Sequence, residues 1–181
     1  SGVTKYLVPV YDMGILSEYE NRGFIVLGLV RGKGSASGHC VAPETLAEKV
    51  QNWAETGTVA AMEYMSRVCE AVGALHDQKV IHRDLKPDNI LLSESGQIRL
   101  VDLGLAATLD SAGYATGSVG TFQYMAPETR REERSSRASD VYSLGLIAYE
   151  LLAGQKTFEP PRDLPEEEKA AWLQLKKEEG K

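Results

Sequence analysis

The stretch HRDLKPDN at residues 82–89 decides how this sequence folds and what it can do. It places a carboxylate at Asp84, an ammonium at Lys86 and a side-chain amide at Asn89 in one short loop between apolar runs. Together these groups can carry out a group transfer, each with a different role. The carboxylate can orient a hydroxyl and accept its proton, the ammonium can meet an anionic group in transfer, and the amide can hold a metal ion. The spacing therefore predicts a catalytic loop.

Three further segments follow this loop in order. Asp102-Leu103-Gly104 comes directly after an apolar run, and Asp102 is a second carboxylate suited to Mg²⁺. GTFQYMAPE occupies residues 120–128, and SDVYSLG at residues 139–145 opens a long apolar helix. A lone Asp-Leu-Gly is usually a turn, and an isolated HRD is weak evidence. The four motifs in this order, at fitting distances, are far more specific than any one of them.

On these motifs the sequence resembles the eukaryotic-type protein kinases, Ser/Thr subclass. The resemblance runs from about Tyr6 to about Phe158 and is most specific between Leu75 and Leu152. The lysine after HRD and the Gly-Thr pair before A-P-E are typical of Ser/Thr kinases rather than tyrosine kinases.

The fold that this resemblance implies is α+β and protein-kinase-like. Residues 1–31 would be a remnant of the small lobe, with two antiparallel strands and the hinge. Residues 32–181 would be the large lobe, mostly helical and incomplete at its C-terminal end.

The resemblance also implies roles for individual residues. Asp140 would fasten the catalytic loop from the long helix, and His82 and Leu103 would belong to a packed column that aligns the active state. Thr121 would hydrogen-bond near Asp84 and Lys86. The implied catalytic residues are Asp84, Lys86, Asn89 and Thr121; the implied ATP-binding residues are Leu27 (gatekeeper), Gly28, Leu29 and Val30 (hinge), Lys86, Asn89, Leu91 (under the adenine) and Asp102; and the implied Mg²⁺ ligands are Asn89 and Asp102.

The implied reaction is transfer of the γ-phosphoryl group of ATP, with Mg²⁺, to a Ser or Thr hydroxyl of a protein substrate. Two other functions remain open. One is a kinase-like remnant, or pseudokinase, that acts as a binding or scaffold module. The other is a small-molecule phosphotransferase of the aminoglycoside-kinase type, although such enzymes lack a segment like residues 120–128.

The sequence departs from the family pattern at both ends. It contains no G-x-G-x-x-G and no V-A-I-K lysine, and Lys5 stands in the wrong context to replace that lysine. The arginine that usually pairs with the A-P-E glutamate, here Glu128, is also missing, and Asp-Leu-Gly replaces Asp-Phe-Gly. We expect truncation of a working kinase rather than a natural remnant, and an isolated chain that is inactive or nearly so.

Composition excludes few functions. The net charge of −6 argues against nucleic acid as the main partner, and no apolar run approaches the roughly 20 residues that cross a bilayer. Cys40 and Cys69 suggest reduced thiols in a cytoplasmic protein, with Cys69 in the core. A zinc site at His39 and Cys40 lacks the usual ligand spacing. His76 is expected to be structural.

The pattern of apolar and turn residues predicts the elements. Strands are expected at Tyr6–Tyr11 and Gly23–Val30, and a flexible loop at residues 31–38. Two more short strands should flank the charged loops near Ile90 and Ile98. Helices are expected at residues 44–55, 59–77 and 140–152 and from about Pro165. Two of them have an apolar face: Val59, Met62, Met65, Val68, Cys69, Val72 and Leu75 in the second, and Leu164, Trp172 and Leu175 in the last.

The segment between Gly104 and Gly120 is rich in hydroxyl side chains and glycine. In the family it would be a mobile activation segment, and Arg83 could pair with a phosphate on Thr116 or Ser118. Ala107 stands where many relatives carry a second basic group, which would weaken such a phosphate pocket.

Overall fold

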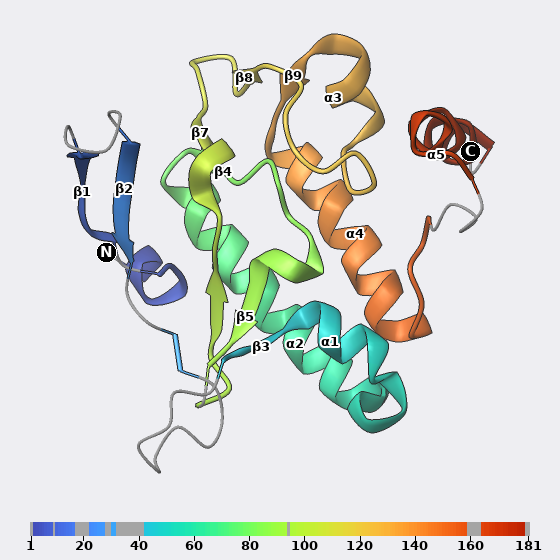
Figure 1. The fold of residues 1–181 in the computed structure, drawn as a ribbon, viewed down its shortest axis with the longest axis horizontal. Helices are drawn as coiled ribbons and strands as arrows, with labels where there is room; N and C mark the ends of the chain where they lie inside the picture. Colours follow the sequence, from blue (N-terminus) through green and yellow to red (C-terminus); the bar gives the residue numbers. More distant parts are fainter. Residues whose placement is uncertain are drawn as a thin grey trace.

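A computed structural model describes residues 2–8, 10–16, 22–27, 30–31, 42–93, 95–158 and 164–179. Figure 1 shows a helical body with short strands along one side, which is the α+β class expected. The body is built around two long helices, α2 (Trp53–Asp77) and α4 (Arg137–Ala153), which lie side by side.

Apolar side chains between these two helices form the centre of the core. Val68, Val72 and Leu75 of α2 are buried in one cluster with Ile147 and Leu151 of α4. Burial of each such side chain contributes about 1.5–3 kcal/mol relative to exposure. The packing of α2 on α4 therefore supplies a rigid base for the loops above it.

The helix expected at residues 44–55 is divided in the structure. Glu44–Thr45 forms strand β3, and α1 (Leu46–Gln51) begins after it. Thr45 caps α1 in a reciprocal capping box with Glu48, which fixes the start of the helix. Asn52 ends α1, and α2 starts at Trp53 with a kink at Gly57, whose φ is +67°.

The prediction of which apolar residues of α2 are buried is partly wrong. Val59 and Met62 are 74% and 63% exposed, and Cys69 is exposed rather than in the core. The buried face instead passes through the small residues Ala61 and Ala71 beside Val68, Val72 and Leu75. The predicted stripe was therefore too wide, because it included apolar residues that flank the buried face.

Short strands frame the loops, as the sequence predicted for Ile90 and Ile98. Strands β5 (Ile90–Leu92) and β6 (Ile98–Leu100) form an antiparallel sheet with β3. Two smaller pairs complete the framework: β4 (Val80–Ile81) with β7 (Ala107–Thr108), and β8 (Ala115–Thr116) with β9 (Arg134–Ser135). Three further short helices in the described part of the chain are η3 (Pro87–Asn89), η4 (Leu103–Leu105) and α3 (Pro127–Glu132).

The N-terminal strand prediction is also shifted. Gly2–Tyr6 forms a short 3-10 helix, η1, and the first strand is β1 (Val10–Leu16). Tyr6 and Leu7 stay on the helical body because Tyr6 donates to Glu70 on α2 and Leu7 bridges to Leu100 on β6. The second strand, β2 (Arg22–Leu27), pairs with β1 and ends before Val30.

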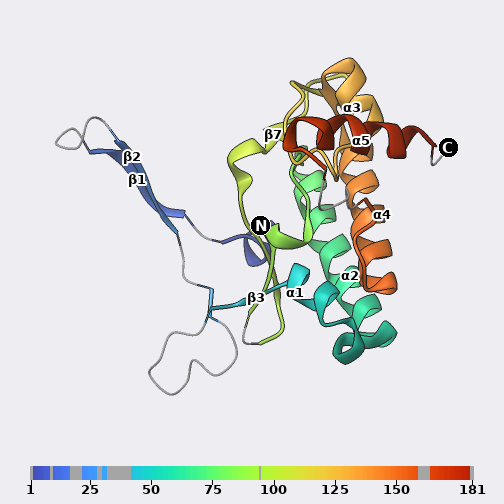
Figure 2. The same cartoon turned by 45° about the vertical axis from the view of Figure 1, so that its right-hand side comes forward.

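The β1–β2 hairpin extends away from the helical body, as Figure 2 shows. Gly28 and Leu29, expected in the hinge, and residues 32–38 of the expected loop lie outside the described residues, as do His39 and Cys40. The division into a small-lobe remnant (residues 1–31) and a large lobe (residues 32–181) therefore stays a prediction.

The last helix begins where the sequence predicted. Pro165 precedes α5 (Glu166–Glu179), while Asp163 lies outside the described residues. Leu164 and Trp172 are half-buried, but Leu175 is 53% exposed, so the apolar face expected there is only partly covered. Among the described segments, no helix is both long and apolar enough to cross a bilayer.

The end of α4 is expected to tolerate only glycine. Gly154 has φ +66°, and a Cβ on it would lie 2.7 Å from Cβ and Cγ of Trp53. We predict that Gly154→Ala lowers the free energy of unfolding by about 2 kcal/mol or more, through left-handed strain and this collision. Gly145→Ala in the same helix is the matched control, because its Cβ would meet nothing within 4 Å. It should be neutral or stabilising by up to about 1 kcal/mol in chemical denaturation, and equal losses for both variants would contradict the argument.

Candidate active site

The loop between β4 and β5 holds the predicted catalytic carboxylate in a fixed position. Asp84 is 5% exposed. Its Oδ1 accepts from the backbone N–H of Thr121 at 2.6 Å, and its Oδ2 accepts from Nδ2 of Asn89 at 3.0 Å. Lys86 Nζ lies 3.2 Å from the same Oδ2. The predicted residues Asp84, Lys86, Asn89 and Thr121 thus meet in one cluster.

Thr121 joins this loop to the segment that follows β8. Lys86 Nζ donates to Oγ1 of Thr121 at 2.9 Å, while the backbone of Thr121 donates to Asp84. The contacts expected from Thr121 to both residues are therefore present. They place an ammonium and a carboxylate side by side at the open edge of the loop.

The charge state of Asp84 follows from these donors. Burial by itself would raise the pKa of the Asp84 carboxyl, but hydrogen bonds from Thr121 and the ammonium of Lys86 outweigh it and hold that pKa below its usual value. The carboxylate is therefore ionised at neutral pH. It can accept a hydrogen bond and a proton from a hydroxyl placed beside it.

Asp140 on α4 anchors the start of the loop. It is 1% exposed, and its two oxygens accept from the backbone N–H of His82 and of Arg83, each at 3.0 Å. His76 Nε2 lies 2.7 Å from Oδ2 of Asp140, which agrees with the structural role expected for this histidine. Arg83 has φ +68°, an unfavourable conformation for a side chain with a Cβ, and Asp140 holds it there.

Position 120, directly before Thr121, can hold only glycine. Its φ is +118°, and a Cβ at this position would lie 2.3 Å from the carbonyl oxygen of Arg83. Only a residue without a side chain lets the two backbones approach so closely. That approach brings the Thr121 N–H within reach of Asp84.

His82 is fully buried beneath the loop. Its Nε2 lies 3.1 Å from the carbonyl oxygen of Val101, and its Nδ1 faces the N–H of Asp84. A neutral ring with the proton on Nε2 satisfies both contacts. Burial lowers the pKa of His82, although nearby carboxylates, Asp140 foremost, work against this shift.

Asn89 and Asp102 form the candidate Mg²⁺ site. The N–H of Val101 donates to the carbonyl of Asn89 at 3.0 Å, which holds the strand end before Asp102 against the loop. Asn89 uses its amide nitrogen on Asp84, so its amide oxygen is the atom left for a cation. Asp102 is exposed, with φ +60°.

These donors fit Mg²⁺, which favours oxygen ligands and commonly binds through one or two protein groups completed by phosphate oxygens and water. Within the described ranges, no cluster of three or more His, Cys, Asp or Glu side chains offers an alternative metal site.

The predicted adenine contacts are only partly described. Leu91 is half-buried on β5, and Val30 is half-buried as well. Leu27 ends β2, while Gly28 and Leu29 lie outside the described residues. The gatekeeper and hinge roles therefore stay predictions.

Arg83 contacts the activation segment directly. Its Nε donates to the carbonyl of Leu105, and its Nη1 donates to the carbonyl of Thr116 at 2.8 Å. The guanidinium that was expected to meet a phosphate is thus held by neutral carbonyl groups. The phosphate pairing remains a prediction.

One buried pair near the site was missed from the sequence. Tyr124 donates its hydroxyl proton to Oε2 of Glu150 at 2.8 Å, and the N–H of Thr157 donates to Oε1. Burial raises the pKa of Glu150. A glutamate in the otherwise apolar stretch of residues 141–152 was the available signal, since such a charge needs buried donors.

Comparison with known proteins decides the family. Residues 21–178 match the family described as the protein kinase domain. The chain belongs to the protein kinase family. It is 32% identical to the serine/threonine-protein kinase PrkC of Bacillus subtilis over 84% of this chain and 22% of that protein.

Two mycobacterial kinases are similar over a shorter stretch. Identity is 38% to PknB of Mycolicibacterium smegmatis, over 54% of this chain and 16% of that protein, and 38% to PknA of Mycobacterium tuberculosis, over 58% and 28%. The chain spans less than a third of the length of each of these relatives. The relatives are Ser/Thr kinases, which agrees with the subclass expected from Lys86 and Thr121.

The buried neutral His82 should make this kinase chain less stable in acid. Because folding lowers its pKa, the unfolded chain binds the proton first as the pH falls below about 6.5. The free energy of unfolding should then fall by up to about 1.4 kcal/mol per pH unit until the folded pKa is reached. We predict that His82→Phe removes this contribution to the pH dependence of the free energy of unfolding, measured by denaturant titrations at pH values from 8 to 5. Parallel curves for the parent and the variant would contradict the assignment.

Proposed function

We propose that this chain is the catalytic large-lobe part of a Ser/Thr protein kinase, which in the full-length protein transfers the γ-phosphoryl group of Mg-ATP to Ser or Thr hydroxyls of proteins. The observation that carries the proposal is the cluster around Asp84. An ionised, nearly buried carboxylate is oriented by Thr121 and Asn89, with the Lys86 ammonium 3.2 Å from it. This is the arrangement that in-line transfer to a hydroxyl requires.

In this mechanism Asp84 orients the acceptor hydroxyl and takes its proton as the oxygen attacks the γ-phosphorus. The bond from that phosphorus to the bridging oxygen breaks, and ADP leaves. Lys86 faces the transferring group, where its charge offsets the negative charge of the phosphoryl oxygens. Asn89 and Asp102 would hold Mg²⁺, which supplies further charge neutralisation when bound.

Three further assignments belong to the same proposal. Residues 1–31 would contribute the small-lobe remnant and hinge, with Leu27, Gly28, Leu29 and Val30 beside the adenine and Leu91 beneath it. Residues 32–181 would form the large lobe. The kinase would act in the cytoplasm, where ATP is plentiful, on protein substrates rather than nucleic acid, in keeping with the net charge of −6.

The role of Asp84 can be tested in the full-length protein. Asp84→Asn keeps the size of the side chain but removes the proton acceptor. We predict a loss of about 10²–10⁴ in the turnover rate, measured by transfer of radiolabelled phosphate to a Ser/Thr peptide.

Asp88→Asn is the matched control, because Asp88 lies in the same loop but is exposed. It should keep nearly the parental turnover rate. Near-normal turnover by a folded Asp84→Asn variant, verified by circular dichroism, would refute the assignment.

The 181-residue chain by itself should transfer little phosphate. Its sequence supplies the lower surface for ATP but neither the glycine-rich loop nor the lysine that would grip the phosphates from above. Water would then reach the phosphates and weaken each charge interaction at the site. Calorimetric titration should show weak ATP binding. Micromolar affinity, or robust turnover that depends on Asp84, would show that the missing groups are dispensable.

A further inference from the structure

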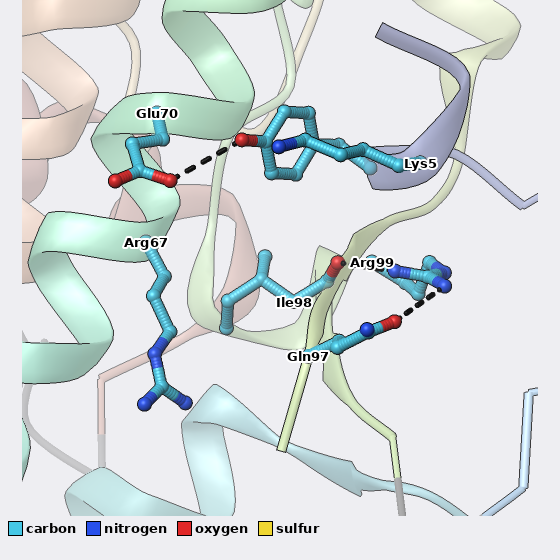
Figure 3. A pocket seen from close by; sticks show the side chains of 7 residues that line it. Lys5, Arg67, Glu70, Gln97, Ile98 and Arg99 are labelled. Carbon is cyan, nitrogen blue, oxygen red and sulfur yellow. Dashed lines mark hydrogen bonds between the residues drawn. The ribbon is translucent and has the colours of Figure 1, made fainter. Parts of the chain in front are cut away.

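A hollow on the helical body lies apart from the residues of the catalytic cluster. Its cavity volume is about 200 Å³, and it is bounded by η1, α2 and the start of β6. Figure 3 shows Arg67 and Glu70 extending from α2 on one side, and Lys5, Gln97 and Arg99 on the other. The residues lining it are Lys5, Tyr6, Arg67, Glu70, Gln97, Ile98 and Arg99.

The cationic side chains around this hollow are held in place by neutral groups. Arg67 NH1 donates to the carbonyl of Gly96 at 2.7 Å. Arg99 donates to Oε1 of Gln97 at 2.9 Å and to the carbonyl of Ile98 at 3.2 Å. Lys5 lies over the Tyr6 ring, with its ammonium 4.5 Å from the ring centre. Carbonyl groups and an aromatic ring orient these charges.

Two carboxylates near the hollow, Glu63 and Glu70, offset part of this charge. Glu63 forms an ion pair with Arg67 one turn away on α2, with 3.7 Å between its Oε2 and Nη2 of Arg67. Glu70 is the one carboxylate among the lining residues, and its Oε2 accepts from the Tyr6 hydroxyl at 3.2 Å. Among the described residues, the lining carries three cations and one anion, and it stays net positive after the Glu63 ion pair is counted, in a chain whose net charge is −6. A local positive site on an acidic protein selects anionic partners.

The arrangement of the cations indicates the shape of the partner. Figure 3 shows Arg67 and Arg99 on opposite sides of the hollow, with Ile98 between them, so their charges do not converge on one point. A single phosphate ion would meet only one of them at a time. An extended chain with several carboxylates could meet all of them, while an apolar side chain rests on Tyr6 and Ile98.

We propose that this hollow is a docking site for an acidic peptide segment of a partner protein, with Lys5, Arg67 and Arg99 as its anchors. An acidic peptide is favoured over nucleic acid because the site is small and the chain as a whole is negatively charged. The proposal does not depend on phosphoryl transfer. It gives the protein a means of holding a partner away from Asp84.

The test is fluorescence anisotropy of a fluorescein-labelled peptide, one leucine followed by four glutamates, titrated with the 181-residue chain. Binding should saturate and weaken as salt is raised from about 0.05 M to about 0.5 M. Combined Lys5→Gln, Arg67→Gln and Arg99→Gln should weaken the affinity by about tenfold or more, because several rim charges are lost together.

Lys79→Gln is the matched control, since Lys79 is an exposed lysine that does not line this hollow. It should change the affinity less than about twofold. Asp84→Asn should bind the peptide like the parent chain, which separates this proposal from the proposed catalytic function. Thermal unfolding of the triple variant verifies that it is folded.

Three outcomes would overturn the proposal: no saturable binding of the peptide, an equal loss of affinity in Lys79→Gln, or tighter binding of a single-stranded thymidine oligonucleotide than of the peptide. The last result would assign the hollow to nucleic acid instead.

Discussion

The geometry of the candidate active site depends on one buried carboxylate. Asp140 is nearly inaccessible to water, and leaving such a charge unpaired would cost several kcal/mol. The N–H groups of His82 and Arg83, together with the His76 ring, surround its two oxygens. These donors belong to the catalytic loop and to α2. The hydrogen bonds that they make to the Asp140 carboxylate therefore also fix the backbone that carries Asp84. Hydrogen bonds to a charged group of this kind contribute about 1.5–3 kcal/mol each.

The same helix organises the remaining segments around the site. Ser139, Ser143 and Glu150 lie along the buried side of α4 with Asp140. Ser139 accepts from Thr129 of α3, Ser143 donates to the Tyr124 carbonyl, and Glu150 accepts from the Tyr124 hydroxyl. A largely apolar helix thus carries a row of buried polar side chains: Ser139 holds α3, Ser143 and Glu150 both hold Tyr124, and Asp140 holds the catalytic loop. Packing on α2 keeps α4 rigid, so these segments share one frame.

Strained backbone occurs where the catalytic loop meets the activation segment. Arg83 and Asp102 have left-handed φ values, and Gly120 sits so close to the Arg83 carbonyl that no Cβ would fit. Each left-handed side-chain residue costs about 1–2 kcal/mol, and such strain persists only where the surroundings over-determine it. Here Asp140 holds Arg83, and Arg83 in turn holds the carbonyls of Leu105 and Thr116. The strained contacts bring Thr121, Asp84 and Lys86 together.

The sequence by itself determined the family, the α+β class and the identity of the clustered residues, because a local loop motif needs its residues at fixed spacing. Helix ends marked by Pro165 and Gly154 could also be predicted, since their chemistry is local. The sequence placed Val68, Val72 and Leu75 on the buried face of α2, but it could not show where that face ends, because Ala61 and Ala71 are too small to mark it in an apolar pattern. Nor could it show that Tyr6 leaves the expected strand for Glu70, or that Tyr124 meets Glu150, since these partners are distant in the chain. Only the tertiary structure brings such donors and acceptors within hydrogen-bonding distance.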